Sequence, residues 1–203
     1  MQPEPTIFAV DDDAAITSTI VQLGKLIGLR VETFASAQEF LDSFDPSRPG
    51  CLVLDVRMPG MSGLELQRRL LSDGIEMPSI MLSGHADVPM AVDAMATGAL
   101  TFLEKPFRVQ ILCDHIQRAI KLDVENRTIR ESRVDLENRL SSLTDKEREV
   151  VDLLIVGKTN KAIAAELGLS RRAVEDRRAR VMKKLNLRTV AELVELVAAT
   201  RAV

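Results

Sequence analysis

The first half of the chain alternates between short apolar runs and longer stretches whose apolar residues recur every three or four positions. The short runs are TIFAV (6–10), RVETF (30–34), CLVLD (51–55), PSIMLS (78–83) and LTFLE (100–104). Runs of this length between polar segments predict strands. The third run is apolar up to its last residue, which is typical of a strand buried on both faces.

The intervening stretches have the spacing of amphipathic helices. They cover residues 14–27, 36–43, 63–73 and 87–97. Gly98 follows the last of them and is typical of a helix C-terminus. Strands that alternate with helices predict an α/β fold in which a five-stranded parallel sheet is doubly wound, and we place this domain at residues 1–120.

From Arg108 a helical pattern begins, and neither Gly nor Pro interrupts it before Gly157. The apolar residues that recur every seven positions are Leu122, Ile129, Leu136 and Leu143. We interpret residues 121–142 as a helical linker. One apolar residue per heptad leaves two interpretations open, because a solvated linker and a linker that pairs in a dimer both fit.

The helical pattern of residues 143–203 predicts an all-α domain of four helices. Thr144 and Glu147 have the spacing of a capping box at the start of the first helix. Two further segments, NKAIAAEL and RRAVEDRRARVMKKL, are joined by a turn that contains Gly168. This is the layout of a helix-turn-helix.

The net charge of −3 is unevenly distributed along the 203 residues. From Leu143 onward there are 13 Lys and Arg against 9 Asp and Glu, a balance of +4, whereas the preceding residues have 14 against 21, a balance of −7. This asymmetry indicates two domains with different partners. Trp and Tyr are absent, which argues against the aromatic base-stacking surfaces of RNA-binding proteins.

The two cysteines, Cys51 and Cys113, lie in apolar surroundings without metal-ligand spacing. We therefore expect free buried thiols in a reducing cytosol. The N-terminus does not have the pattern of a signal peptide, and no apolar run approaches the roughly 20 residues of a membrane span. We expect a cytoplasmic protein without membrane contact.

Polar residues stand at the ends of the predicted strands. Asp11 and Asp12 follow the first strand, Asp55 closes the third, Ser83 closes the fourth and Lys105 follows the fifth. The carboxyl ends of parallel strands meet at one edge of the sheet, so these side chains should converge. Carboxylates brought together in this way favour a hard cation, Mg²⁺ or Mn²⁺. With a Lys and a hydroxyl nearby, the arrangement fits phosphoryl transfer.

The aspartates near these strand ends, Asp55 and the consecutive Asp11, Asp12 and Asp13, have different predicted roles. Asp55, the lone carboxylate at the end of the central strand, is the candidate nucleophile, because an Asp can accept a phosphoryl group. Asp11 and Asp12 would complete the cation site with it. Asp13 precedes the first helix and is better explained as its N-cap.

The segments VDDD, LDVRMPGMSGLEL, MLSGHADVPMAV and GALTFLEKPF occur in this order. In them the chain resembles the receiver domain of bacterial two-component response regulators, especially the FixJ group. The resemblance covers about residues 1–120. It implies that a sensor histidine kinase phosphorylates Asp55, and that the backbone carbonyl of Arg57 joins the three carboxylates in binding Mg²⁺.

The same resemblance implies further roles. Lys105 would pair with the phosphoryl group, and the Lys105–Pro106 peptide would be cis. Ser83 and Phe102 would form the switch pair that responds to phosphorylation. Position 83 is often Thr in the family, and Ser retains the hydroxyl.

The second helix of the helix-turn-helix is the basic one, as expected of a helix that enters the DNA major groove. The candidate DNA contacts are Lys161, Arg171, Arg172, Arg177, Arg178, Arg180, Lys183 and Lys184. Residues 143–200 resemble the LuxR-type DNA-binding domain. Ala173, Glu175, Asp176 and Arg177 depart from its usual pattern, which puts the family's operator sequence in doubt for this chain but not DNA binding.

These observations predict a phosphorylation-dependent transcription regulator that binds double-stranded promoter DNA. Phosphorylation would favour a homodimer through the 87–97 helix and the 101–104 strand, and RNA polymerase is a further candidate partner. We expect no enzymatic activity beyond the receiver's own phosphoryl transfer and dephosphorylation.

Two alternatives belong to other functional classes. The first is a phosphohydrolase resembling haloacid dehalogenases, with Asp11 as the nucleophile of a D-x-D motif; it would leave the helix-turn-helix unexplained. The second is a receiver whose C-terminal helices bind a protein rather than DNA. The acidic pair Glu175 and Asp176 favours this hypothesis.

Overall fold

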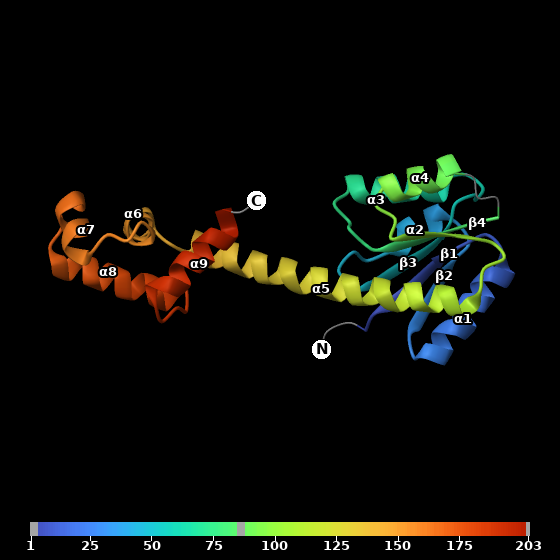
Figure 1. The fold of residues 1–203 in the computed structure, drawn as a ribbon, viewed down its shortest axis with the longest axis horizontal. Helices are drawn as coiled ribbons and strands as arrows, with labels where there is room; N and C mark the ends of the chain where they lie inside the picture. The colour runs from blue at the N-terminus through green and yellow to red at the C-terminus, as the bar shows by residue number, and fades with distance from the viewer. Residues whose placement is uncertain (1–3, 85–87, 202–203) are drawn as a thin grey trace. The chain divides into compact units, whose positions relative to one another are not determined.

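The computed structural model describes residues 4–84 and 88–201, and Figure 1 shows the fold. The chain divides into two compact units, Met1–Arg127 and Thr128–Val203. Asp87, which the sequence pattern places at the start of a helix, lies outside the described residues.

The first unit has a parallel sheet in the order β2-β1-β3-β4-β5, as the doubly wound prediction requires. The strands are β1 (Thr6–Val10), β2 (Arg30–Phe34), β3 (Gly50–Asp55), β4 (Ser79–Ser83) and β5 (Thr101–Glu104). The helices are α1 (Ala14–Ile27), α2 (Ala37–Ser43), α3 (Gly63–Ser72), α4 (Val88–Ala96) and α5 (Val109–Ser141). The strand order reverses between β1 and β3, where ligands bind in open α/β sheets.

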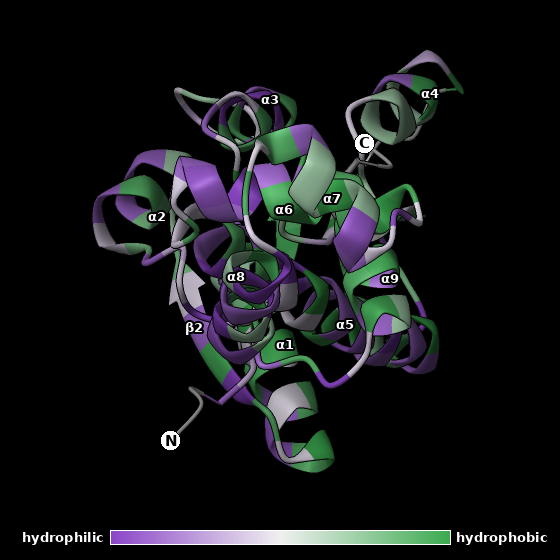
Figure 2. Ribbon diagram, turned by 90° about the vertical axis from the view of Figure 1, so that its left-hand side faces the viewer, coloured by the Kyte–Doolittle hydropathy of each residue, from purple (hydrophilic) through white to green (hydrophobic). Residues whose placement is uncertain are grey.

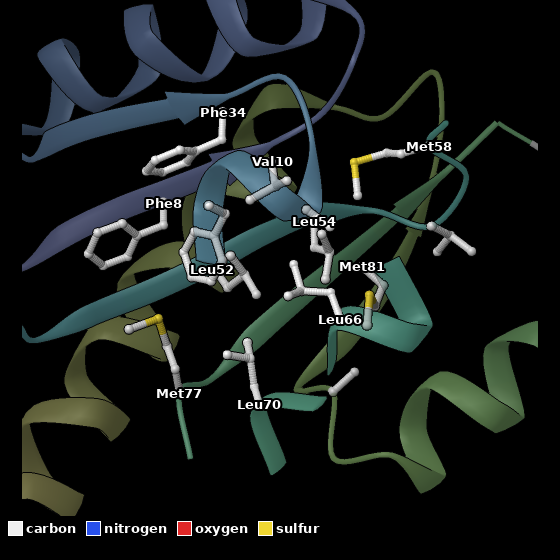
Figure 3. Packing of buried hydrophobic residues seen from close by; sticks show 14 of the residues in the cluster. Phe8, Val10, Phe34, Leu52, Leu54, Met58, Leu66, Leu70, Met77 and Met81 are labelled. Atoms are coloured by element: carbon white, nitrogen blue, oxygen red, sulfur yellow. The ribbon is translucent and has the colours of Figure 1, made fainter. Parts of the chain in front are cut away.

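Two apolar clusters cover the two faces of the sheet. In Figure 3, Phe8, Leu52 and Leu54 of the strands meet Leu66 and Leu70 of α3 in the cluster that α2, α3 and α4 cover. The alternate strand residues, such as Ile7 and Val53, point to the other face and pack against α1 and α5. Every residue of β3 is buried, which confirms the interpretation of its uninterrupted apolar run.

The first helix begins as predicted. Asp13 is the N-cap of α1, and its Oδ1 accepts a hydrogen bond at 2.8 Å from the backbone N–H of Ala15. Gly28 ends the helix in the left-handed conformation with φ 72°. This conformation costs a glycine little, because it has no Cβ.

Helix α5 is longer than the part of it that covers the sheet. Asp123 is buried at the loop before β3, and Arg127 donates from Nη1 to the carbonyl of Ser47 at 3.0 Å and from Nη2 to that of Arg48 at 2.8 Å. These contacts extend the first unit to Arg127, into the segment 121–142 that the sequence pattern indicates as a linker.

The second unit contains the last part of α5 and the helices α6 (Asp145–Ile155), α7 (Asn160–Leu167), α8 (Arg171–Lys184) and α9 (Val190–Arg201). Their apolar faces form one core around Val150, Ile163, Val174 and Val181. The capping box at α6 is present, with the carboxylate of Glu147 accepting from the backbone N–H of Thr144 at 2.9 Å. The predicted all-helical segment is therefore a packed domain.

Candidate functional site

Three carboxylates meet at the carboxyl ends of β1 and β3. Each of Asp11, Asp12 and Asp55 offers an oxygen that lies within 4.8 Å of the others. Asp11 and Asp55 are 2% and 5% exposed, whereas Asp12 is exposed to solvent. The neighbouring strands β1 and β3 bring them together, because Val10 and Leu54 are paired in register.

Lys105 reaches this cluster from the segment after β5. Its Nζ lies 2.6 Å from Oδ2 of Asp11 and 2.8 Å from Oδ1 of Asp55. Burial alone would lower the pKa of Lys105, but the hydrogen bonds to the two carboxylates outweigh it and raise that pKa. The lysine is therefore a fixed positive charge in the site. The Lys105–Pro106 peptide is cis, as expected.

Asp11 is held on both oxygens. Oδ2 accepts a hydrogen bond from Nζ of Lys105, and Oδ1 accepts one at 2.9 Å from the backbone N–H of Asp13. Burial raises the pKa of Asp11 above its ordinary value of 3.8, although the bonds to Lys105 and Asp13 oppose the shift. A divalent cation at this position would favour the ionised form and compensate for the cost of burial.

The loop after Asp55 lies close to its carboxylate. Arg57 donates its backbone N–H to Oδ2 of Asp55 at 3.1 Å. Gly63, at the start of α3, approaches so closely that an added Cβ would lie 2.2 Å from the backbone oxygen of Asp55. Glycine therefore permits the contact that packs α3 against the end of β3.

Ser83 and Phe102 lie on the two strands at the other side of Asp55. Ser83 ends β4 and is fully buried; its Oγ lies 3.6 Å from Sδ of Met90, and its backbone oxygen accepts from the N–H of Lys105 at 2.8 Å. Phe102 is half-buried on β5, next to Met81 in the register of the sheet. The sequence gives no signal for the contact with Met90.

The donor set suits a hard divalent cation. The described residues supply carboxylate oxygens from Asp11, Asp12 and Asp55, without a thiol or imidazole in the group. So few protein ligands leave coordination positions for water and for a phosphoryl oxygen, as Mg²⁺ prefers. The residues present therefore fit such an ion.

The second unit contains a helix-turn-helix. Helices α7 and α8 are joined by Gly168, Leu169 and Ser170; Gly168 has φ 63°, and Ser170 caps α8 by accepting from the N–H of Ala173 at 3.1 Å. Val174 and Val181 are fully buried and fix the inner face of α8. Most of the ribbon of α8 has hydrophilic colours in Figure 2.

The predicted DNA contacts do not all have the same surroundings. Lys161, Arg172, Arg180 and Lys183 are exposed, and Arg177 is half-buried. Three others bind within the domain. Arg171 pairs with Glu175 at 2.9 Å, Arg178 donates to Oδ1 of Asn160 at 3.3 Å, and Lys184 pairs with Glu147 at 2.7 Å. We infer that Lys184 also has a structural role, because it ties the end of α8 to the start of α6.

Sequence comparison assigns both units to known families. Residues 7–117 match the response regulator receiver domain, and residues 141–197 match the bacterial regulatory proteins of the luxR family. The chain belongs to the response regulators. This response regulator is 40% identical to Nodulation protein W of Bradyrhizobium diazoefficiens over 190 residues, which cover 94% of this chain and 84% of the relative.

Two solved structures resemble the response regulator along its whole length. The response regulator StyR is 45% identical in sequence and superposes with a TM-score of 0.92. The match covers 97% of this chain and 99% of that one. Full-length FixJ from B. japonicum is 38% identical, with a TM-score of 0.58 and 99% of each chain covered. The response regulator is therefore a transcription regulator that joins a receiver to a LuxR-type DNA-binding domain.

Family membership also bears on the two alternatives. The receiver family accounts for the aspartates without a phosphohydrolase nucleophile at Asp11, and the luxR family favours DNA over a captured protein. In residues 4–84 and 88–201, no helix has the length and apolar character needed to cross a membrane.

Proposed function

We propose that this response regulator accepts a phosphoryl group on Asp55 from the phosphohistidine of a sensor histidine kinase. A carboxylate oxygen of Asp55 forms the new bond to phosphorus as the bond from phosphorus to the imidazole nitrogen breaks, and the histidine leaves as the neutral ring. The observation that supports this role is the position of Asp55 between Asp11, Asp12 and Lys105. This placement supplies the positioning and charge neutralisation on which phosphoryl transfer depends.

Asp11, Asp12, Asp55 and the backbone carbonyl of Arg57 would hold Mg²⁺, which supplies positive charge to the phosphoryl oxygens when it is bound. Lys105 loses its partner on Asp55 when that carboxylate becomes an acyl phosphate, and its Nζ then pairs with a phosphoryl oxygen. Mn²⁺ has the same preference for oxygen ligands and would substitute.

Ser83 and Phe102 would transmit the phosphorylation of Asp55 to the surface of the receiver. The hydroxyl of Ser83 leaves Met90 and donates to the phosphoryl group, and Phe102 turns inward into the space beside β4. Met90 belongs to α4, so the switch alters the helix on which Val88, Val92 and Met95 are 77%, 61% and 50% exposed. Exposed apolar side chains of this kind favour a homodimer through α4 and β5.

A dimer would place two copies of α8 about one DNA turn (roughly 34 Å) apart, so that both enter the major groove of a promoter. Lys161, Arg172, Arg177, Arg180 and Lys183 would neutralise phosphates or read guanine edges, with Arg171, Arg178 and Lys184 beside them. Bound in this way, the protein would act on transcription through RNA polymerase.

Radiolabelled acetyl phosphate with Mg²⁺ tests the assignment of Asp55. The wild type should become labelled, and Asp55→Asn should not. Asp13→Asn is the matched control, because Asp13 belongs to the same aspartate triplet but caps α1; this variant should be labelled like the wild type. Persistent labelling of Asp55→Asn would falsify the assignment. A gel shift with and without phosphorylation then tests whether the phosphoryl group controls DNA binding.

A further inference from the structure

The outward face of α8 carries a carboxylate at its centre. Val174 and Val181 are fully buried and define the inner side of the helix. Asp176 follows Val174 by two residues, which turns its side chain by about 200° around the helix axis. It is exposed, as its position opposite the buried side requires. The side of α8 that a helix-turn-helix presents to DNA therefore has Asp176 in its middle.

Two arginines flank this carboxylate on the same face. Arg172 precedes Asp176 by four residues and Arg180 follows it by four, so that the three side chains form one row along the helix. In the part of the chain that the structure describes, no hydrogen bond or ion pair engages Asp176. Its charge is therefore not committed to a partner within the domain.

Glu175, the other acidic residue of this turn, differs from Asp176 in its place on the helix and in having an ion-pair partner. It lies beside the row rather than in it, and its Oε1 accepts from Nε of Arg171 at 2.9 Å. That pair neutralises Glu175 within α8 itself. Of the two acidic side chains, Asp176 is thus the one without an ion-pair partner among the described residues.

A carboxylate in the major groove is repelled by every phosphate, so it weakens binding to DNA of any sequence. Among the base edges in that groove, the N4 amino group of cytosine is the partner that carboxylates take. The arginines on either side are suited to guanine O6 and N7 or to phosphates, which would hold the helix in place around this contact.

We infer that Asp176 is a specificity-determining residue, which accepts a hydrogen bond from N4 of one cytosine in each half-site of the operator. The inference rests on the proposed DNA binding and adds the base class that this position reads. It also gives a physical reason for an acidic residue in the centre of a basic helix.

Selection of bound DNA from a random pool tests this inference with the full-length, phosphorylated chain. The wild type should enrich sites with cytosine at one position of each half-site. Asp176→Ala should lose that preference by about fivefold or more at this position only, and it should bind unrelated DNA more tightly because a repulsive charge is gone. Asp176→Asn should shift the preference from cytosine to adenine, since Asn pairs with adenine N6 and N7.

Glu175→Gln is the matched control, because it removes the neighbouring negative charge from the same turn. It should retain the cytosine preference. The fold of each variant is checked by circular dichroism. If the wild type enriches a site and Asp176→Ala prefers the same bases at every position, the inference is wrong while DNA binding stands. If the wild type enriches no sequence, the proposed function itself fails.

Discussion

The carboxylate of Asp123 on α5 accepts a hydrogen bond at 2.8 Å from the backbone N–H of Gly50, the first residue of β3. The same oxygen, Oδ2, accepts from Nε of Arg127 at 2.8 Å. Asp123 is 1% exposed, so both bonds lie in a region with little screening by water. They attach the middle of α5 to the central strand of the receiver.

Replacing Asp123 by Ala should lower the free energy of unfolding by about 3 kcal/mol, because it leaves the N–H of Gly50 and Nε of Arg127 without their acceptor. Urea unfolding of the full-length chain measures this change. Arg133→Ala is the control: Arg133 pairs with Glu137 on the same helix, but both side chains are about half-exposed, and the loss should stay below about 1 kcal/mol. Equal losses for the two variants would contradict the prediction.

The ion pair between Glu147 and Lys184 makes the stability of the second unit depend on pH. The hydrogen bond from Lys184, together with that from the backbone of Thr144, lowers the pKa of Glu147 from 4.5 to about 2. Since the folded state binds this proton more weakly than the unfolded state, the contribution is complete above about pH 4.5 and is lost as the pH falls toward 2. Glu147→Gln should be less stable than the wild type at pH 7, with a difference that shrinks over that range.

Hydrogen exchange of the amides in α6 and α8 of the full-length chain measures this difference. Glu149→Gln serves as the control, because Glu149 is an exposed carboxyl on the same helix. A difference between Glu147→Gln and the wild type that stays constant from pH 7 to pH 2 would show that Glu147 does not act through its charge.

Gly63 should be essential for the position of Asp55. A Cβ at residue 63 would lie 2.2 Å from the backbone oxygen of Asp55 and 2.9 Å from Cγ of Leu54, so α3 or the end of β3 must move. We expect Gly63→Ala to lose about 1–3 kcal/mol of stability and to slow labelling by acetyl phosphate. In Gly84→Ala the new Cβ has no described atom within 4 Å apart from residue 84 and its chain neighbours, and labelling should continue at the wild-type rate.

Lys105 should compete with Mg²⁺ for the carboxylates of the site. Its Nζ lies within 2.8 Å of both Asp11 and Asp55 and repels a dication at the same oxygens. Lys105→Met should therefore bind Mg²⁺ more tightly, by roughly tenfold, and should transfer phosphoryl groups more slowly. Titration calorimetry with MgCl₂ compares it with Lys25→Met, which removes an exposed lysine of α1. Weaker Mg²⁺ binding by Lys105→Met would overturn this prediction.

The convergence of the site residues could be predicted because it depends on topology alone. Asp11, Asp55 and Ser83 stand at the ends of strands, and the strands of a parallel sheet end at one edge. Asp13 was equally accessible to sequence reasoning, since its role as N-cap depends only on the residues next to it. Predictions of this kind need no knowledge of side-chain packing.

Contacts that depend on packing between distant segments could not be predicted. Asp123 and Gly50 are 73 positions apart, and a charged residue in a helical pattern ordinarily indicates a solvated face. The helical period likewise does not say which of Leu70 and Leu71 faces the sheet; Leu70 is buried, whereas Leu71 is 41% exposed. The pairing of Arg171 with Glu175 depends on side-chain conformations that the spacing permits but does not require.

Lys105 lies 94 residues after Asp11 and 50 after Asp55 in the sequence, on the segment that follows β5, the last strand of the sheet. Contacts of such long range are slow to form, because closing the long intervening chain into a loop costs entropy. During synthesis the three aspartates leave the ribosome well before the lysine does. Under the proposed role of Lys105, a nascent receiver therefore lacks the partner of the phosphoryl group until the segment after its final strand has been made.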